Sequence, residues 1–422
     1  MTASQSQAPQ GARAFLFLQG PISPFFTRIG DALAQRGHAV HSVHLSIGDW
    51  MLWRRAGGVS YRGRLAEWEA FIAGFMDRHR ITDLVLLGEQ RDYHKQAIAL
   101  ASERGIAVTV TDFGYLRPDW ITFERDGMSA CSHVPRDPQV IRRLAEGLAE
   151  ADCSRRYQDS FWTMAFWDIG YHLANYFLWW LYPHYRSHKM ANPVLIYLGT
   201  GLRLLLAPWN QRRAERALQK LTAGNKPVFV FPLQMAYDFQ LRAYSPFKDQ
   251  DEAIDKVLTS FAAHAPRDSR LLVKVHPLDP GMRSWGGLVR RIARRLGIAQ
   301  RVAYIDGGNL DRIIKTAVGM VTINSTSGLR AIYLGCPVIT LGDAIFDIEG
   351  LTFQQGLDRF WSECAPPDRA LRAAFVNLLA ATIQLRGVYY NEPGLQAAVK
   401  AAAHRLHHRA VNEILPPNSP GR

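Results

Sequence analysis

The sequence contains few cysteines and no pair of them at a metal-binding spacing. Four occur in 422 residues, none in a CxxC pair. This excludes a disulfide-stapled scaffold and a cysteine-rich zinc module, and it fits a reducing compartment. The sequence also lacks a run of about 20 apolar residues, which argues against a conventional transmembrane helix. The cysteines are Cys131, Cys153, Cys336 and Cys364.

Acidic residues are scarce relative to basic ones. The chain has 37 Asp and Glu against 50 Lys and Arg, a formal net charge of +13. Such an excess indicates an acidic partner, whether nucleic acid, an anionic membrane or a phosphorylated substrate. No recognised nucleic-acid-binding module is present, so we expect no nucleic acid partner. Residues 1–13 lack the charged and apolar pattern of a secretory leader, and we expect a flexible tail on a cytoplasmic protein.

The composition of the chain is that of a globular protein, and strand patterns alternate with helical ones. Hydrophobic residues make up 48% and charged residues 21% of the chain, and the length predicts two or three domains. The alternation predicts a Rossmann-like α/β domain with a parallel sheet over residues 14–150. Its apolar runs lie at 14–19, 39–45, 83–88 and 106–111, with helical patterns at 24–33 and 94–104.

A second series of apolar runs follows Gly224 and predicts a second Rossmann-like domain over residues 224–370. We expect residues 371–422 to form C-terminal helices that pack back, and a tail. Two such domains place a cleft between the carboxyl ends of their strands, where ligands bind in sheets of this kind. The runs of the second domain lie at 227–231, 271–275, 302–305, 318–323 and 337–341.

Residues 151–223 form a helical linker segment that is rich in aromatic and basic residues. Within residues 161–185, eleven of 25 are aromatic, against 11% for the whole chain. Trp and Tyr prefer the headgroup region of a bilayer, and basic flanks are attracted to anionic lipid. One interpretation is therefore a helix that lies on a membrane surface. The alternative is an aromatic-rich helical layer packed between the two domains.

Two motifs in the second domain are typical of phosphate recognition. His276 and Pro277 come directly after a strand pattern, which places the imidazole at the strand's carboxyl end, with Lys274 as a nearby positive charge. The run 325–328 lies between a buried strand and a helix. Hydroxyl groups and backbone N–H groups at a helix start form an anion site. The structural alternatives are a core histidine and a plain N-cap, which needs only one hydroxyl residue. The run consists of Ser325, Thr326, Ser327 and Gly328.

Three polar residues follow the first strand of the second domain: Gln234, Asp238 and Gln240. A carboxylate that faces the cleft can act as a nucleophile or a base. The alternative for Asp238 is a turn residue. No acidic cluster with the spacing of a metal site stands out, so we expect no metal and no cofactor.

Two loops of the first domain carry ionisable residues where strands end. Either Glu89 or Asp112 is a candidate general acid or base, and each has a neighbouring arginine with which it could merely pair. The loop residues singled out are Glu89, Arg91, His94, Asp112, Tyr115 and Arg117.

In this order, the motifs resemble those of the KpsS/LipB-type capsule polysaccharide biosynthesis proteins, a family of β-Kdo transferases, over nearly the whole chain. The combination of Gly-Tyr-Leu-Arg-Pro at 114–118 with Thr-Ile-Asn-Ser-Thr at 322–326 is specific, whereas His-Pro alone is not. The motifs that carry the resemblance are Leu18–Pro21, 114–118, Ile121-Thr122-x-Glu124, 135–138, Arg186-x-His188-Lys189, Asp238-x-Gln240, His276-Pro277, 321–326 and Asp347–Thr352.

The resemblance implies a GT-B glycosyltransferase, with two Rossmann-like domains facing a central cleft. It would take Kdo from CMP-Kdo and pass it to lyso-phosphatidylglycerol at the inner face of the cytoplasmic membrane, beside other capsule biosynthesis and export proteins. The product would start the poly-Kdo linker of a capsular polysaccharide. Asp238 is the implied nucleophile of a retaining reaction. The implied donor-binding residues are His276, Lys274, Ser325, Thr326, Ser327, Gly328, Gln234 and Gln240, and the implied acceptor-binding residues are Gln19, Gly20, Arg91, His94, Tyr115 and Arg117.

One departure from the family pattern concerns the acid/base. Members often carry two adjacent acidic residues before Gly-Tyr-Leu-Arg-Pro, and here the pair is Asp112 and Phe113. We favour Asp112 as the group that handles the acceptor hydroxyl, with Glu89 second. Two other functions stay open: a GT-B transferase for another CMP-sugar, and a non-catalytic adaptor that docks a capsule assembly complex on the membrane.

Overall fold

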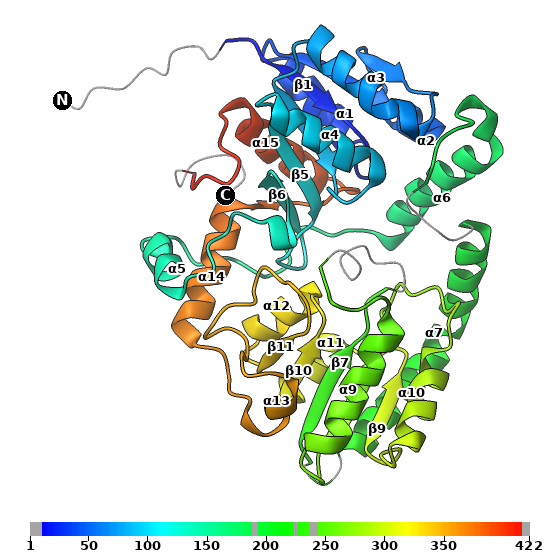
Figure 1. The fold of residues 1–422 in the computed structure, drawn as a ribbon, viewed down its shortest axis with the longest axis vertical. Coiled ribbons are helices and arrows are strands. Elements are labelled where there is room, and N and C mark those ends of the chain that lie inside the picture. Colours follow the sequence, from blue (N-terminus) through cyan, green and yellow to red (C-terminus); the bar gives the residue numbers. More distant parts are fainter. Residues whose placement is uncertain (1–10, 188–192, 223, 225, 236–243, 416–422) are drawn as a thin grey trace. The chain divides into compact units, whose positions relative to one another are not determined.

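The computed structural model describes residues 11–187, 193–222, 224, 226–235 and 244–415. The chain divides into two compact units, each built from segments that are distant in the sequence (Figure 1). Unit 1 comprises residues 1–133, 153–188 and 380–422, and unit 2 comprises residues 134–152 and 189–379. The predicted linker segment is thus shared between the units, and the chain's last helix belongs to unit 1. The predicted domain boundaries at 150, 223 and 370 stay predictions.

Unit 1 is built on a seven-stranded mixed sheet with the order β12-β6-β5-β4-β1-β2-β3. The first five strands in the sequence are parallel, whereas β6 and β12 are antiparallel to their neighbours. The predicted parallel sheet is therefore extended by two antiparallel strands at one edge. The strands are β1 (Ala14–Phe17), β2 (Ala39–His44), β3 (Gly58–Ser60), β4 (Asp83–Leu87), β5 (Ala107–Phe113), β6 (Trp120–Arg125) and β12 (Gln384–Arg386).

Strand alternation divides the core of unit 1 between the two faces of this sheet. Phe15 and Phe17 pack with α1 (Phe25–Ala34) and α15 (Gly394–His407). Leu16 and Leu18 pack on the other face with α3 (Leu65–Arg78) and α4 (Asp92–Glu103). The remaining helices of unit 1 are α2 (Ile47–Leu52), η1 (Ser129–Cys131), α6 (Phe161–Phe177) and η2 (Trp179–Leu181).

Unit 2 is built on a five-stranded, fully parallel sheet with the order β11-β10-β7-β8-β9. Its core includes Phe231, Val273 and Val321 from the strands and Phe261 and Trp285 from the covering helices. The strands are β7 (Val228–Pro232), β8 (Arg270–Lys274), β9 (Val302–Ile305), β10 (Gly319–Thr322) and β11 (Val338–Thr340). The helices are α5 (Pro138–Ala145), α7 (Pro193–Thr222), α9 (Gln250–His264), α10 (Trp285–Arg295), α11 (Leu310–Thr316), α12 (Thr326–Tyr333), α13 (Leu357–Glu363) and α14 (Arg369–Thr382), the last of which ends in unit 1.

The predicted α/β class with two Rossmann-like sheets is confirmed. Every apolar run that predicted a strand overlaps one in the structure. In unit 1, β1 lies between β2 and β4, and in unit 2, β7 lies between β8 and β10. The strand order therefore reverses between β1 and β4 and between β7 and β10. These reversals are the switch points where open α/β sheets bind ligands. Among the described residues, no helix is long and apolar enough to span a bilayer.

Candidate functional site

The hydroxyl-rich run predicted to bind phosphate forms the N-cap and the first turn of α12, directly after β10. Ser325 is the N-cap of α12, and its hydroxyl accepts from the Ser327 N–H at 3.3 Å. The Ser327 hydroxyl donates to Ser325 Oγ at 3.0 Å. A Cβ at Gly328 would lie 2.8 Å from the Phe346 ring, so this glycine allows α12 to pack closely. The positive end of the α12 dipole therefore lies at a turn that carries the hydroxyl residues Ser325, Thr326 and Ser327.

His276 lies two residues beyond β8, at the carboxyl end of its strand as predicted. Its Nδ1 accepts from the Leu278 N–H at 3.1 Å, which assigns the proton of the neutral ring to Nε2. The backbone oxygen of His276 accepts from Arg203 at 3.2 Å. Arg203 comes from α7 and also donates to the Asp306 carboxylate at 2.8 Å. Two independent contacts thus fix the backbone and the ring of this loop.

Lys274, the last residue of β8, is buried in unit 2. Burial lowers the pKa of its ammonium, while the nearby Asp306 carboxylate opposes that change. Its Nζ lies 3.3 Å from the Val275 carbonyl oxygen, to which it donates. The lysine therefore lies inside unit 2 beside Asp306, with its ammonium donating to the backbone of its own strand end.

Gln234, which follows β7, forms hydrogen bonds to Asn324, which follows β10, at the switch point of the sheet. Its Nε2 donates to Asn324 Oδ1 at 2.9 Å, and the Asn324 N–H donates back to Gln234 Oε1 at 3.4 Å. The Gln250 amide holds the backbone of Gln234 by two further hydrogen bonds of 3.0 Å each. Since this amide is committed to Asn324, we interpret Gln234 as a residue that positions the phosphate-type turn. The other two predicted residues here, Asp238 and Gln240, lie outside the described residues.

The sheet order brings the residues predicted to bind the sugar donor to the carboxyl end of the unit 2 sheet. We call this end of the sheet the donor edge. His276 follows β8, Gln234 follows β7 and the Ser325 turn follows β10, and these three strands are adjacent and parallel. Parallel neighbours are spaced about 4.8 Å apart, so the ends of β8 and β10 lie about 10 Å apart. This span suits a ligand the size of a nucleoside monophosphate.

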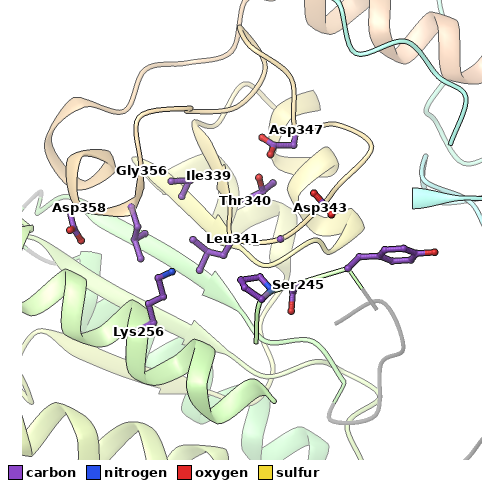
Figure 2. Close-up of a pocket in the computed structure, with 13 residues that line it drawn as sticks. Ser245, Lys256, Ile339, Thr340, Leu341, Asp343, Asp347, Gly356 and Asp358 are labelled. Carbon is purple, nitrogen blue, oxygen red and sulfur yellow. The ribbon is translucent and has the colours of Figure 1, made fainter. Parts of the chain in front are cut away.

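A cavity of about 680 Å³ opens beside the end of β11, next to this edge (Figure 2). Asn324 connects the two, because its Nδ2 donates at 3.3 Å to the Tyr244 carbonyl oxygen at the cavity wall. Three carboxylates and one lysine line the cavity, so its charge disfavours a phosphate. No sequence pattern predicted this cavity, although Asp347 belongs to one of the motifs that carry the family resemblance. Its ionisable lining residues are Lys256, Asp343, Asp347 and Asp358.

In unit 1, Gln19 follows β1 and belongs to a buried polar network. Its Nε2 donates to Asp49 Oδ2 at 3.0 Å and to the Tyr185 hydroxyl at 3.1 Å. The Tyr171 hydroxyl, from α6, donates to Asp49 Oδ1 at 2.7 Å. Burial raises the pKa of Asp49, and these hydrogen bonds partly offset the rise. A Cβ at the neighbouring Gly20 would lie 2.4 Å from the Phe26 ring, so Gly20 is required for packing.

Glu89 and Arg91 lie in the loop after β4, and His94 lies in the first turn of α4. The Glu89 side chain is buried, and Arg91 is half-buried at the N-cap of α4. His94 is fully buried, with Nδ1 at 2.8 Å from the Gly88 carbonyl oxygen. Burial lowers the pKa of His94 to about 3, so its ring is neutral at physiological pH. In the structure His94 holds the loop after β4 in place.

A buried carboxyl group for which the sequence predicted no role lies close to Glu89. Glu124, on β6, is fully buried and accepts a hydrogen bond from the Ser132 hydroxyl. Burial raises its pKa to about 8, and the charge of Glu89 adds to the rise. Tyr115 is also buried close to both carboxyl groups, and its hydroxyl accepts from the Ser129 N–H at 2.7 Å. Glu124 is therefore a protonated acid at neutral pH.

Asp112 and Arg117 lie at the carboxyl end of β5. Asp112 is half-exposed, and its Oδ1 accepts from the Phe113 N–H at 2.7 Å. Phe113 is exposed, and the Arg117 guanidinium lies 5.8 Å from its ring centroid. Of the two predicted acid/base candidates, Asp112 is the more exposed. Among the described residues, no group of His, Cys, Asp and Glu is arranged to hold a metal ion.

The aromatic segment forms α6 and η2, and its apolar side chains point outward. They recur at helical spacing along one face of α6, with Trp162 76% and Phe166 72% exposed. The opposite face is held to unit 1 by polar contacts, including Gly48 N–H to Asn175 Oδ1 at 2.8 Å. The exposed aromatic and aliphatic side chains of this surface, the α6 face, are Trp162, Phe166, Ile169, Leu173, Tyr176, Phe177, Trp179 and Trp180.

Comparison with known proteins identifies related chains over almost the whole length. Residues 82–390 match a family described as capsule polysaccharide biosynthesis protein. The capsule polysaccharide export protein KpsS of Escherichia coli is 30% identical over 386 residues, 90% of this chain and 97% of the relative. The capsule polysaccharide modification protein LipB of Neisseria meningitidis is 31% identical over 390 residues, 91% of this chain and 93% of the relative. The solved β-Kdo 2,7-transferase KpsC of Thermosulfurimonas dismutans aligns with 92% of this chain and 97% of its own, at 14% identity and a TM-score of 0.46.

Proposed function

The chain belongs to the capsule polysaccharide biosynthesis protein family, and we propose that it is a retaining glycosyltransferase that moves Kdo from CMP-Kdo to lyso-phosphatidylglycerol. The observation that carries the proposal is the edge of unit 2, where His276, Gln234 and the Ser325 turn follow three adjacent parallel strands. Such an edge suits a nucleotide with a single phosphate, because one helix N-terminus and one imidazole serve as its donors.

Departure of CMP is the step that this edge would assist. As the bond between the anomeric carbon and the phosphate oxygen breaks, the phosphate gains negative charge. The α12 N-terminus, the Ser327 hydroxyl and the His276 ring would stabilise that charge. The hydrogen bonds that fix Ser325, Asn324 and the His276 loop preorganise these donors before the substrate binds.

Retention of configuration requires two displacements, and we assign a carboxylate to each. In the first, Asp238 attacks the anomeric carbon, CMP leaves, and a glycosyl ester forms on the carboxylate. In the second, the acceptor hydroxyl attacks the same carbon, the ester bond breaks, and Asp112 takes the hydroxyl proton. Glu89 is the second choice for that proton, since its side chain is buried.

The acceptor is a lipid, and we propose that the protein works peripherally at the inner face of the cytoplasmic membrane. The α6 face supports this placement, since it exposes five Trp and Phe side chains together with Tyr176 at its outer surface. The formal charge of +13 favours an anionic donor, an anionic acceptor and an anionic bilayer alike.

The test is a transfer assay with the purified full chain, CMP-Kdo and a fluorescent lyso-phosphatidylglycerol analogue, with linkage analysis of the product. We expect a β-linked Kdo product, and Asp238→Ala should reduce its formation at least about a thousandfold. Asp268→Ala, which removes an exposed aspartate of the same unit, is the matched control and should keep full activity.

Two results would contradict the proposal and indicate a specific alternative. Transfer of a sialic acid from its CMP-sugar, without transfer of Kdo, would indicate a transferase for another CMP-sugar. Intact capsule formation in cells with Asp238→Ala, together with its loss when Trp179 and Trp180 are replaced, would indicate a non-catalytic membrane adaptor. The exposure of both tryptophans is the observation that favours this alternative.

A further inference from the structure

Exposed apolar side chains are concentrated on two helices. Fifteen of the twenty-six large hydrophobic side chains that are exposed in the described residues lie between Trp162 and Trp209. Eight of them form the α6 face of unit 1. The other seven lie on α7 of unit 2, in the part of the predicted linker segment 151–223 that follows the aromatic run.

The inward face of α7 is attached to unit 2 along the length of the helix. A Cβ at Gly199 would lie 2.4 Å from the Pro280 carbonyl oxygen. Further along, Arg203 and Asn210 both donate to the Asp306 carboxylate, at 2.8 and 3.2 Å. Ala214 is buried one turn later. The orientation of α7 about its own axis is therefore fixed, and so is the direction of its other face.

The outward face of α7 has two parts that follow one another along the same side. The first is apolar and is exposed by as much as 81% at Leu205. The second is basic and exposed. Helical spacing of about 100° per residue places both parts on one side of α7, roughly 115° around the helix from Arg203. We call this surface the α7 strip; its members are Leu195, Leu198, Leu202, Leu205, Leu206 and Trp209, followed by Arg212, Arg213, Arg216 and Lys220.

We propose that the α7 strip docks unit 2 on an anionic lipid bilayer, with its leucines in the interface and its basic end against the headgroups. Aliphatic side chains beside Trp and Arg on one exposed helix surface suit contact with the interface of an anionic bilayer. The Arg213 guanidinium lies 4.0 Å from the Trp209 ring centroid, at the junction of the two parts. A second copy of the chain fits less well, because a symmetric contact through the strip would bring the basic ends of both copies into one interface.

The docking has a consequence for the donor edge, since α7 connects the two. Arg203, on the inward face, holds the backbone of His276, and the leucines on the outward face would lie at the lipid surface. Bilayer contact would therefore bring the His276 loop close to the membrane. The inference itself depends on the surface of α7 and not on the proposed reaction, so it is tested without donor or acceptor.

The test is co-sedimentation of the full chain with vesicles of phosphatidylcholine, with and without phosphatidylglycerol. Replacing Leu202 and Leu205 with Gln should lower the partition coefficient about tenfold on both vesicle types. The matched control is Leu144→Gln, an exposed leucine of α5 in the same unit, and it should bind like the wild type.

The basic part is tested separately. Replacing Arg212, Arg213 and Arg216 with Gln should lower binding to phosphatidylglycerol vesicles about fivefold per charge, with little effect on neutral vesicles. A charge-matched control replaces three exposed arginines of unit 2 away from the strip: Arg143, Arg267 and Arg294. Brominated acyl chains should quench wild-type tryptophan fluorescence more than that of Trp209→Phe.

Three outcomes would overturn the proposal. Unchanged vesicle binding by the leucine variant would show that α7 does not enter the interface. An equal loss of binding in the charge-matched control would show that net charge alone attracts the chain to the bilayer. A dimer in light scattering that the leucine variant disperses would identify a second copy as the occupant. Each of these results is independent of whether Kdo is transferred.

Discussion

Replacing Glu124 with Gln should make the stability of unit 1 less dependent on pH. The side chain is fully buried on β6, and burial raises its pKa from the ordinary value of 4.5 to about 8. Between these two values the unfolded chain carries an ionised Glu124 and the folded chain a protonated one. Stability conferred by this group is therefore lost progressively as the pH rises from about 4.5 to about 8 and is constant outside that window.

The size of the effect follows from the same two pKa values. Each pH unit inside the window costs about 1.4 kcal/mol of unfolding free energy, so the step from pH 6 to pH 7.5 costs about 2 kcal/mol. Gln has the same shape and can accept the Ser132 hydroxyl hydrogen bond without ever ionising. The variant should therefore gain about 2 kcal/mol on the wild type across this step.

The assay is urea unfolding at pH 6, 6.5, 7 and 7.5, followed by tryptophan fluorescence. Glu69→Gln, on the exposed side of α3, is the matched control and should track the wild type at every pH. If Glu124→Gln and the wild type lose stability in parallel, the carboxyl group is ionised when folded and the reasoning is refuted. Glu89→Gln offers a further check, because removal of the neighbouring charge should lower the pKa of Glu124.

Three further predictions concern packing and hydrogen bonding. Gly20→Ala should lower the free energy of unfolding, measured in urea, by about 1–3 kcal/mol, because the new Cβ would clash with the Phe26 ring. Gly74→Ala on α3 is the control: its Cβ would contact nothing within 4 Å, so the substitution should raise the free energy of unfolding by up to about 1 kcal/mol. Arg203→Lys should weaken CMP binding about tenfold in calorimetry, because a lysine cannot hold both Asp306 and the His276 backbone in the same geometry. Asp49→Asn should increase the rate of proteolytic cleavage within α6 about tenfold, because the amide cannot accept at both positions from the donors that the carboxylate serves.

Most of the parallel strands were predictable because they are short apolar runs that are largely buried, whereas the three-residue parallel strand β3 is exposed and was not predicted. The sequence pattern of 14–19 needs no distant partner to be recognised as a strand, and the structure places β1 at Ala14–Phe17. The antiparallel strand β12 has no such signal. It is three residues long, and it pairs Gln384 with Thr122, more than 250 positions away. Such an edge strand is specified by its partner rather than by its own sequence.

The role of Glu124 was hidden for a related reason. Five of the six residues of β6 are buried, so the strand shows no alternation from which a buried carboxyl group would stand out. Only the combination of β6 with the Ser132 segment and the loop of Glu89 creates its environment. The quoted motif marked the residue, but its chemistry comes from three segments that meet in the fold.

In the aromatic segment, the sequence predicted a helix but did not predict which side of that helix packs against the rest of unit 1. An apolar stripe at helical spacing usually predicts the side of a helix that enters the core. In α6 the stripe is exposed, and the side that enters unit 1 carries Tyr171 and Asn175, which bond to Asp49 and to the Gly48 N–H. Both polar partners belong to α2, so the inversion could be recognised only once α2 and α6 were placed together.

The donor edge of unit 2 gains its rigidity from side chains that are occupied with one another. Ser325 caps α12, Gln234 and Asn324 bond reciprocally, and Nδ1 of His276 is used by its own loop. A phosphate that binds here would meet donors whose positions are already set, so little reorganisation would oppose the build-up of charge on the departing CMP. Arg203 extends this chain of fixed contacts to α7, and thus to the surface that we propose to lie on lipid. The donor edge and the α7 strip are consequently connected through α7, which contacts the His276 loop on one side and carries the strip on another.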